Sequence, residues 1–390
     1  MAKYSKPLLS VPEGLEPLSP NPGGMGEPDA LVGRERELAR LLEAVSAGGA
    51  HVSGERRMGK TWLVKKLQDE LAETVTAIYV SAETSDLDLF ADRLLVALRE
   101  NRLVRDRISR WEKEVGGELK LGIGVAGLKL TAKATRAASV DHDPRGLDVL
   151  DLLGSQSGGP VVLIIDEITH LCHSLGRETA GEFLSGLRRR RQSGGPPLVI
   201  SGSVGLHHAL EDFAPVNDLW PVVVGALDHS DALVLATRLL LGIGAEPTPE
   251  VVADIVQETS GIPYYIHAVV DRLRYRTDID VAAVVNECIT DNAWNTDHYV
   301  TRLTEYYGPD GAARARAVLD VVALSEQSLA VDEISTQVSI RNADMTLTRD
   351  HLLDLLDKLE RDHYLIRDGT VDSMSSALLA RIWRRHRRLP

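Results

Sequence analysis

The residues best suited to chemistry stand in one short loop, Gly54–Thr61. Its sequence, Gly-Glu-Arg-Arg-Met-Gly-Lys-Thr, fits the spacing G-x-x-x-x-G-K-[ST]. The two glycines let the backbone wrap closely around a phosphate, so that successive N–H groups point at the anion. Lys60 would reach the β- and γ-phosphates of a nucleotide, and Thr61 would offer its hydroxyl to Mg²⁺. A basic turn that caps an ordinary helix is the alternative. The strand-like residues 50–53 before the loop and the helix-like residues 62–67 after it favour the phosphate loop.

Two acids follow an apolar run, Val161–Ile165, about a hundred residues after this loop. A continuous Val/Ile/Leu run is typical of a strand buried on both faces, in the middle of a parallel sheet. Open α/β sheets bind ligands at the carboxyl ends of their strands, so Asp166 is placed to hold Mg²⁺ through water. Glu167 is placed to polarise the attacking water. An acidic helix start is the alternative, which the upstream phosphate loop makes the weaker interpretation.

Composition limits the class of protein. The 390 residues are enough for two or three domains, and the hydrophobic content of 44% is ordinary for a globular protein. No stretch approaches the ~18 to 20 apolar residues of a membrane span, and the N-terminus lacks the apolar core of a secretory signal. We therefore expect no membrane partner and a cytoplasmic location. Cys172 and Cys288 predict neither a disulfide framework nor a zinc site. The net charge of −13 argues against nonspecific coating of nucleic acid, although a local basic surface stays open.

The first part of the chain alternates between strand-like and helix-like segments. Strands are predicted at 76–81, 161–165, 198–203 and 221–224, and helices at 31–45, 87–100 and 167–191. This alternation predicts an α/β fold, a right-handed parallel sheet with helices on both faces. Residues 1–30 hold six of the seventeen prolines and no apolar period, which predicts an extended or disordered arm.

Residues 118–133 change to a period of two, which predicts a β-hairpin with its turn between Gly124 and Gly127. One face of this hairpin carries Lys120, Lys129 and Lys133. A basic hairpin could grip a nucleic-acid backbone or a polypeptide. We favour the plainer interpretation, an edge ribbon that its lysines keep soluble.

From about Leu227 the pattern becomes helical. Three helices are predicted at 312–324, 331–338 and 348–362, then a hairpin centred on Asp368-Gly369 and a last helix at 377–388. Three helices and a hairpin make a winged helix-turn-helix. The predicted domains are thus an arm at 1–30, a core at 31–226, a helical lid at 227–305 and a winged helix domain at 306–390.

In this order of elements the chain resembles the AAA+/STAND branch of the P-loop ATPases, in particular prokaryotic ATPases of the archaeal type with a C-terminal winged helix. The resemblance covers roughly residues 31–390. It implies a parallel-sheet P-loop NTPase core, ATP and Mg²⁺ as ligands, and ATPase activity that can be slow or triggered by a partner.

The resemblance also implies a set of site residues. Val32-Gly33-Arg34-Glu35 looks like the element whose backbone lies against adenine, and Gly261-Ile262-Pro263 looks like the G-x-P element of the lid. Ser201 and Ser203 stand where a sensor would contact the γ-phosphate or the attacking water. The expected nucleotide contacts are Val32, Gly33, Arg34, Gly54, Glu55, Arg56, Arg57, Met58, Gly59, Lys60, Thr61, Trp62, Gly261 and Pro263. The expected catalytic residues are Glu167, Lys60, Ser201 and Ser203, with Thr61 and Asp166 on the metal.

The chain departs from the family at one point. AAA+ enzymes usually carry an arginine finger after this sensor, but no Arg or Lys occurs between Gly202 and Thr237. The finger is therefore missing or comes from elsewhere, such as Arg188–Arg191. This departure favours a switch that hydrolyses slowly over a ring with efficient turnover, and it leaves a homo-oligomer open.

Three functions are compatible with these features. The favoured one is an ATP/ADP switch whose winged helix contacts a protein partner. The alternative is a DNA-associated ATPase that binds duplex through the hairpin, the winged helix or the arginine-rich tail after Ala380. A nucleotide-binding scaffold without catalysis is disfavoured by the presence of Glu167. Charge separates the first two, because residues 310–380 hold thirteen acids and seven bases and helix 348–362 holds five and three. DNA therefore stays open as a partner but is not favoured.

Overall fold

The computed structural model describes residues 14–24, 30–72, 74–102, 104–106, 108–109, 117–124, 127–134, 147–148, 160–203, 205–209, 214–276, 278–342, 345 and 347–390. The chain divides into two compact units, which are described separately. The sheet unit is Glu27–Val224. The helical unit combines Met1–Gly26 with Gly225–Pro390.

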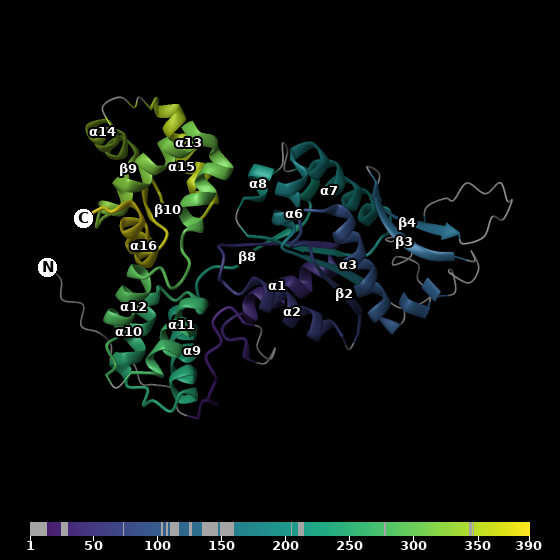
Figure 1. The fold of residues 1–390 in the computed structure, drawn as a ribbon, viewed down its shortest axis with the longest axis horizontal. Coiled ribbons are helices and arrows are strands. Elements are labelled where there is room, and N and C mark those ends of the chain that lie inside the picture. Colours follow the sequence, from purple (N-terminus) through teal and green to yellow (C-terminus); the bar gives the residue numbers. More distant parts are fainter. Residues whose placement is uncertain are drawn as a thin grey trace. The chain divides into compact units, whose positions relative to one another are not determined.

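The sheet unit is built on five parallel strands in the spatial order β2-β6-β7-β1-β8. The two outer strands, β2 and β8, are labelled in Figure 1. The strands are β1 (Gly49–Ser53), β2 (Thr76–Ser81), β6 (Val161–Asp166), β7 (Leu198–Ser201) and β8 (Trp220–Val223). This confirms the predicted α/β fold with a parallel sheet. Because β7 lies between β1 and β6, the loop after β1 and the acids after β6 are separated by one strand. The carboxyl end of β7 therefore belongs to the same site.

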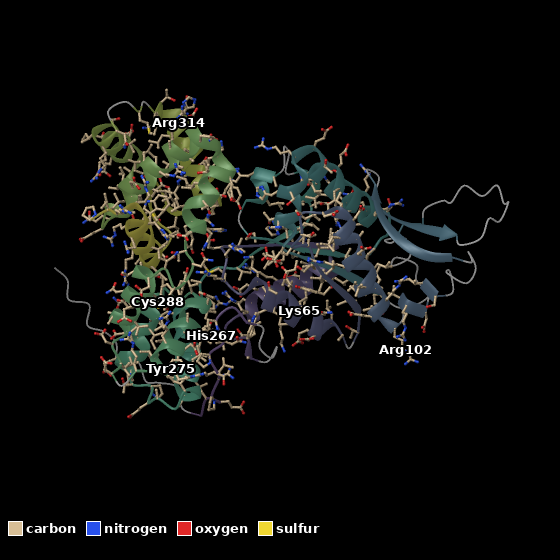
Figure 2. All side chains as sticks on the ribbon, viewed as in Figure 1. Lys65, Arg102, His267, Tyr275, Cys288 and Arg314 are labelled. Atoms are coloured by element: carbon tan, nitrogen blue, oxygen red, sulfur yellow. The ribbon has the colours of Figure 1, made fainter. Side chains whose placement is uncertain are left out.

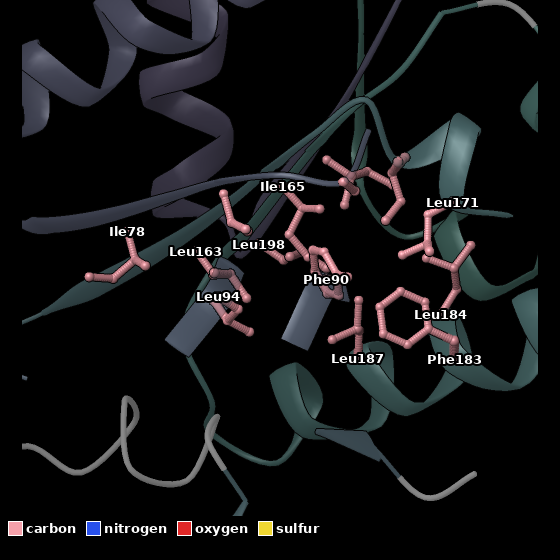
Figure 3. Close-up of a cluster of buried hydrophobic side chains, with 14 of the residues drawn as sticks. Ile78, Phe90, Leu94, Leu163, Ile165, Leu171, Phe183, Leu184, Leu187 and Leu198 are labelled. Atoms are coloured by element: carbon pink, nitrogen blue, oxygen red, sulfur yellow. The ribbon is translucent and has the colours of Figure 1, made fainter. Parts of the chain in front are cut away.

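Helices cover both faces of this sheet, since a strand such as β6 is buried along its whole length. They are α1 (Glu35–Ser46), α2 (Lys60–Leu71), α3 (Leu87–Glu100), α6 (Ile168–Leu175), α7 (Arg177–Gln192) and the short α8 (Leu206–Ala209). On one face Leu163 and Ile165 meet side chains of α3 and α7 in a cluster of buried residues (Figure 3). The rings of Phe90 and Phe183 meet there edge to face, with centroids 5.9 Å apart.

The predicted helix 167–191 is wrong in one respect, because two helices occupy this stretch. The backbone turns at Gly176, with φ 75° and ψ 161°, and α7 begins after it. Glycine adopts this conformation without steric cost, so its position between two helix-forming runs was the available signal.

The predicted hairpin is present as β3 (Gly117–Gly124) and β4 (Gly127–Ala134), with a third strand β5 (Leu147–Asp148) paired to β4. The predicted turn residues 125–126 lie outside the described residues. The register pairs Lys133 with Glu118 and Lys129 with Asp148. The role of this hairpin stays a prediction.

The helical unit begins with four helices, α9 (His229–Gly242), α10 (Pro249–Thr259), α11 (Pro263–Leu273) and α12 (Val281–Thr290). Helix α13 follows at His298–Leu324, with a kink where Gly308 (φ 69°) precedes Pro309. The remaining elements are β9 (Leu329–Ala330), α14 (Val331–Arg341), α15 (Arg349–Arg361), β10 (Leu365–Asp368), β11 (Val371–Met374) and α16 (Ala377–Arg387). The strands β10 and β11 form the predicted hairpin, with its turn one residue later than expected. The short strand β9, which pairs with β11, was not predicted.

Helix α16 binds the other parts of the helical unit together. Arg381 pairs with Glu258 of α10, and Arg385 donates to the carbonyl of Thr290 at 3.1 Å. Arg387 makes two hydrogen bonds to Asp320 of α13, at 3.0 and 2.8 Å. Three arginines of the basic tail are thus engaged inside the unit. This tail was one of the surfaces on which the DNA alternative relied.

An N-terminal strap, residues 14–24, lies extended against α9 and α11. The side chain of Arg238 donates to the carbonyl of Glu16 at 2.9 Å, and its own carbonyl accepts the amide of Leu18 at 2.8 Å. The amide of Asn21 donates to Nδ1 of His267 at 3.1 Å. This part of the predicted arm is therefore extended but attached, and an imidazole that accepts through Nδ1 must be neutral.

We predict that the strap loosens in mild acid. Burial lowers the pKa of His267 to about 4, whereas an unfolded histidine titrates near 6.5. The unfolded state therefore binds more protons between these values, and stability is lost as pH falls from about 6.5 toward 4, by about 2 kcal/mol at pH 5. Denaturant unfolding at pH 7 and 5 should show a smaller loss in His267→Asn, which keeps a short acceptor that does not titrate. The protection factors for amide hydrogen exchange in residues 14–24 should fall with acid only in the wild type. An equal pH response of both proteins would contradict this assignment.

Candidate functional site

The loop after β1 has the left-handed backbone that a phosphate loop needs. The φ angles of Gly54, Arg57 and Gly59 are 148°, 73° and 87°. A Cβ on Gly54 would collide with the carbonyl oxygen of Val224, because the loop passes directly over the end of β8. Gly59 precedes the first residue of α2 and has open space beside it. The loop thus ends at a helix N-terminus, where backbone N–H groups are free of helical partners.

Lys60 is the centre of the loop. Its side chain is buried, and Nζ donates to the carbonyls of Gly54 at 3.0 Å and Glu55 at 2.8 Å. Burial lowers the pKa of this ammonium, and the nearby carboxylates of Glu167, Glu55 and Asp166 oppose that shift. Neutral carbonyls satisfy its hydrogen bonds without neutralising its charge, so an anion that enters the loop gains a buried cation.

Asp166 ends β6 as a buried carboxylate held by three donors. The hydroxyl of Ser201 donates to Oδ1 at 2.6 Å, and the amide of Glu167 donates to the same oxygen at 3.0 Å. The hydroxyl of Tyr79 donates to Oδ2 at 3.0 Å. This carboxylate is therefore oriented before any ligand binds.

Glu167 follows in the left-handed conformation, with φ 56°, and directly precedes α6. Its carboxyl group is partly buried, and burial raises its pKa, opposed by the charge of Lys60. A carboxylate with a raised pKa is a better proton acceptor than an ordinary glutamate. The strand order brings this acid and Lys60 to the same edge of the sheet.

The two sensor serines have different environments. Ser201 is completely buried and its hydroxyl is directed to Asp166. Ser203 is partly exposed, and its carbonyl accepts the hydroxyl of Thr169 at 3.1 Å. The contact of either serine with a γ-phosphate stays a prediction, and the exposed Ser203 is the better placed of the two.

Arg34 holds the phosphate loop through a hydrogen bond to its backbone, a role that the sequence did not indicate. Its buried guanidinium donates to the carbonyl of Met58 at 3.0 Å and pairs with Glu37 at 3.0 Å. The neighbouring Gly33 has φ 67°. The spacing of three residues between Arg34 and Glu37 was the available signal. The predicted adenine contact of Val32, Gly33 and Arg34 stays a prediction.

The other predicted residues fall into two groups. Glu55 is buried, Arg56 is exposed, and Thr61 and Trp62 are partly exposed at the start of α2. Gly261 and Pro263 belong to the helical unit. There the carbonyl of Gly261 accepts the amide of Leu227 at 3.0 Å, and Pro263 is the first residue of α11, so the predicted helix junction is present. Their contact with nucleotide stays a prediction.

The arginines suggested as a substitute finger are partly engaged within the chain. Asp218 pairs with Arg191 and with Arg188, the latter at 3.3 Å. Burial would raise the pKa of Asp218, but these arginines hold it below its usual range. Arg189 is exposed at the end of α7. A contribution of Arg188 or Arg191 to a neighbouring molecule would have to break these pairs.

Residues 30–204 match an AAA ATPase domain. Among solved structures, the chain is similar to the Walker-type ATPase PABY2304 of Pyrococcus abyssi, with 16% identity, 91% of this chain and 96% of that chain covered, and a TM-score of 0.64. It also matches the ORC2 protein of Aeropyrum pernix at 11% identity, covering 97% and 96%, with a TM-score of 0.46. The RuvB Holliday junction branch migration motor of Thermotoga maritima matches at 13%, covering 92% and 96%, with a TM-score of 0.39. No curated protein sequence matches the chain.

These comparisons establish the fold. The similarity to PABY2304 shows that the sheet unit has the P-loop NTPase fold of AAA-type ATPases, whereas the two weaker similarities carry no argument. Within the described ranges no helix is long and apolar enough to cross a membrane. Among the same residues no three His, Cys, Asp or Glu side chains cluster as a metal cage. The donors at this edge are one hydroxyl, one oriented carboxylate and a loop for phosphates, a set that suits Mg²⁺ bound together with a nucleotide.

We predict that the two loop glycines differ in their tolerance of alanine. Gly54→Ala should disrupt the loop, because its Cβ would strike the backbone of Val224 as well as strain φ. Gly59→Ala faces only the strain of φ 87°, of order 1 to 3 kcal/mol. Thermal unfolding together with ATP calorimetry checks this. Gly54→Ala should lose binding, and Gly59→Ala should keep measurable binding with a lower melting temperature. The reverse order would contradict the described loop geometry.

Proposed function

We propose that this protein is an ATP-binding switch of the AAA+/STAND type that hydrolyses ATP slowly or when a partner triggers it. The observation that carries the proposal is the buried ammonium of Lys60, held by neutral carbonyls beside Asp166 and Glu167. A nucleotide phosphate would give this ammonium an anionic hydrogen-bond partner in place of neutral carbonyls. Thr61 and Asp166 would hold Mg²⁺, which when bound neutralises charge on the β- and γ-phosphates.

The residues of the chain then have distinct roles in hydrolysis. The loop amides and Lys60 bind and orient the phosphates, and Lys60 stabilises the charge that develops as the bond to the γ-phosphorus breaks. Glu167 accepts a proton from the attacking water, and its raised pKa suits that role. The oxygen of that water bonds to the γ-phosphorus, and ADP leaves with its electron pair. Ser201 holds Asp166 in place throughout.

The proposal of slow turnover rests on the arginines near the end of α7, which were the candidates for a substitute arginine finger. Near the end of α7, Arg189 is exposed, whereas Arg188 and Arg191 are paired with Asp218. Stabilisation of transition-state charge on a γ-phosphate then depends on cations of the loop, such as Lys60, unless a partner contributes another. A trigger by a partner fits this arrangement.

The C-terminal elements α14, α15 and the β10–β11 hairpin support a winged helix that docks a protein. Two of the three basic residues of α15, Arg349 and Lys358, pair with Asp332 and Asp354, and the third, Arg361, is exposed. Arg367 of the hairpin pairs with Asp357 and Asp372. Basic groups already paired with acids are poor contacts for phosphates. We therefore retain protein contact as the proposed role and find no observation that favours the DNA alternative.

Lys60→Ala should abolish ATP binding. The substitution removes the only buried cation of the loop, and loss of a charge-assisted contact of about 3 kcal/mol lowers affinity at least about 100-fold. Calorimetry with ATP and Mg²⁺ measures this. Lys66→Ala is the matched control, because Lys66 lies on the same helix and pairs with Glu70 at the surface. Equal affinity of Lys60→Ala and the wild type would remove the phosphate-loop assignment.

Glu167→Gln should bind ATP with nearly unchanged affinity and fail to hydrolyse it. The amide keeps the shape of the side chain but cannot accept the proton of water, which lowers a rate by roughly 10² to 10⁴. Phosphate release under saturating ATP measures the rate, and calorimetry measures the affinity. Glu70→Gln on the surface of α2 should behave as the wild type. Turnover of Glu167→Gln at the wild-type rate would show that another group is the base.

A further inference from the structure

Tyr79 lies in the middle of β2 and reaches the end of the neighbouring strand. The register pairs Tyr79 with Ile164 and Ser81 with Asp166, so Asp166 lies two residues further along β6. Ile78 and Val80 point into the hydrophobic core, and strand alternation sends Tyr79 to the opposite face. From there its hydroxyl donates to Oδ2 of Asp166 at 3.0 Å.

This hydrogen bond completes the set of donors around Asp166. A carboxylate offers about four lone-pair sites, two on each oxygen. The Ser201 hydroxyl and the Glu167 amide occupy both sites of Oδ1, and Tyr79 occupies one site of Oδ2. One acceptor direction remains, on the oxygen that Tyr79 holds. The tyrosine therefore determines where Asp166 can accept a further hydrogen bond or meet a cation.

Lys65 of α2 adds a third member to this chain of contacts. Its Nζ lies 3.2 Å from the centroid of the Tyr79 ring, within the range of a cation–π interaction. A phenol is protonated at neutral pH, so Tyr79 acts there as a hydrogen-bond donor. Lys65 is labelled in Figure 2. It stands four residues after Thr61 and so lies on the same side of α2.

The chain of contacts therefore connects the two elements that carry the metal-side residues. Thr61 and Lys65 belong to α2, and Asp166 belongs to β6. Strand β7 lies next to β6 on its other side, and there Ser201 also holds Asp166. Tyr79 supplies the corresponding support from β2. Asp166 is thus held from both neighbouring strands.

We propose that Tyr79, with Lys65 over its ring, is a positioning residue that fixes the Asp166 carboxylate relative to Thr61 and thereby sets the affinity for the Mg²⁺–nucleotide complex. The inference rests on the proposed function, because it assigns a role in that same site. Tyr79 touches neither phosphate nor water in this role and acts through Asp166.

The test compares ATP affinity with and without Mg²⁺. Tyr79→Phe removes one hydroxyl and keeps the ring under Lys65. By calorimetry its ATP affinity in EDTA should stay within about twofold of the wild type, since the phosphate loop is untouched. Its gain in affinity on adding Mg²⁺ should be roughly 10-fold smaller, as for other residues that orient a metal ligand. Tyr275→Phe is the control, because Tyr275 is 79% exposed and lies in the helical unit (Figure 2).

A double-mutant cycle tests the participation of Lys65. Lys65→Met keeps the length of the side chain and removes the charge, and it should reduce the Mg²⁺-dependent gain in the wild type but add nothing in Tyr79→Phe. Equal Mg²⁺ gains in Tyr79→Phe and the wild type would overturn the proposal, and additive effects would exclude Lys65 from it. A wild type that binds no ATP at all would instead refute the proposed function.

Discussion

A buried positive charge is the constraint around which the sheet unit is arranged. The ammonium of Lys60 is buried and donates hydrogen bonds to two carbonyls of its own loop, which are neutral and do not balance its charge. The nearest compensation comes from the carboxylates of Glu167, Glu55 and Asp166. The loop can enclose the ammonium only because Gly54 lies directly against the backbone of Val224 and Arg34 ties the carbonyl of Met58. Each of these contacts shapes a site for an anion.

The order of the strands brings the loop of Lys60 and the two acids to the same edge of the sheet. With β7 between β1 and β6, the strand that leads to the loop of Lys60 and the strand that ends in the two acids are separated by one strand. The intervening strand contributes Ser201, whose hydroxyl would otherwise be an unsatisfied buried group. Asp166 therefore has its orientation fixed by hydrogen bonds from both sides. A preoriented carboxylate loses little entropy when it binds, which is what a nucleotide site requires.

Much of this could be predicted from the sequence, because the decisive signals are local. The spacing of Gly54, Gly59 and Lys60 and the apolar run before Asp166 predict a loop and a strand from adjacent residues, and the parallel sheet follows from the alternation of segments. The contacts between distant residues could not be predicted in this way. Nothing near Tyr79 indicates that its hydroxyl meets Asp166, since 87 positions separate them. Helix breaks were missed for a related reason. Gly176 breaks a helix only because its backbone there takes φ 75°, whereas Gly181 lies within α7.

The basic tail shows why a charge cluster must be interpreted with its partners. From sequence, the arginines of α16 form a candidate surface for phosphates, and the helix dipole alone would favour them there. In the structure Arg381, Arg385 and Arg387 join α16 to α10, α12 and α13, and the indole of Trp383 donates to the same Asp320 that Arg387 contacts. The strap adds a further attachment, to α9 and α11. The predicted lid and winged helix are therefore cross-linked by many polar contacts and fall in one compact unit. Under the proposed switch, a change at the nucleotide would have to act on this unit as a whole, because the contacts of α16 oppose movement of the lid helices alone.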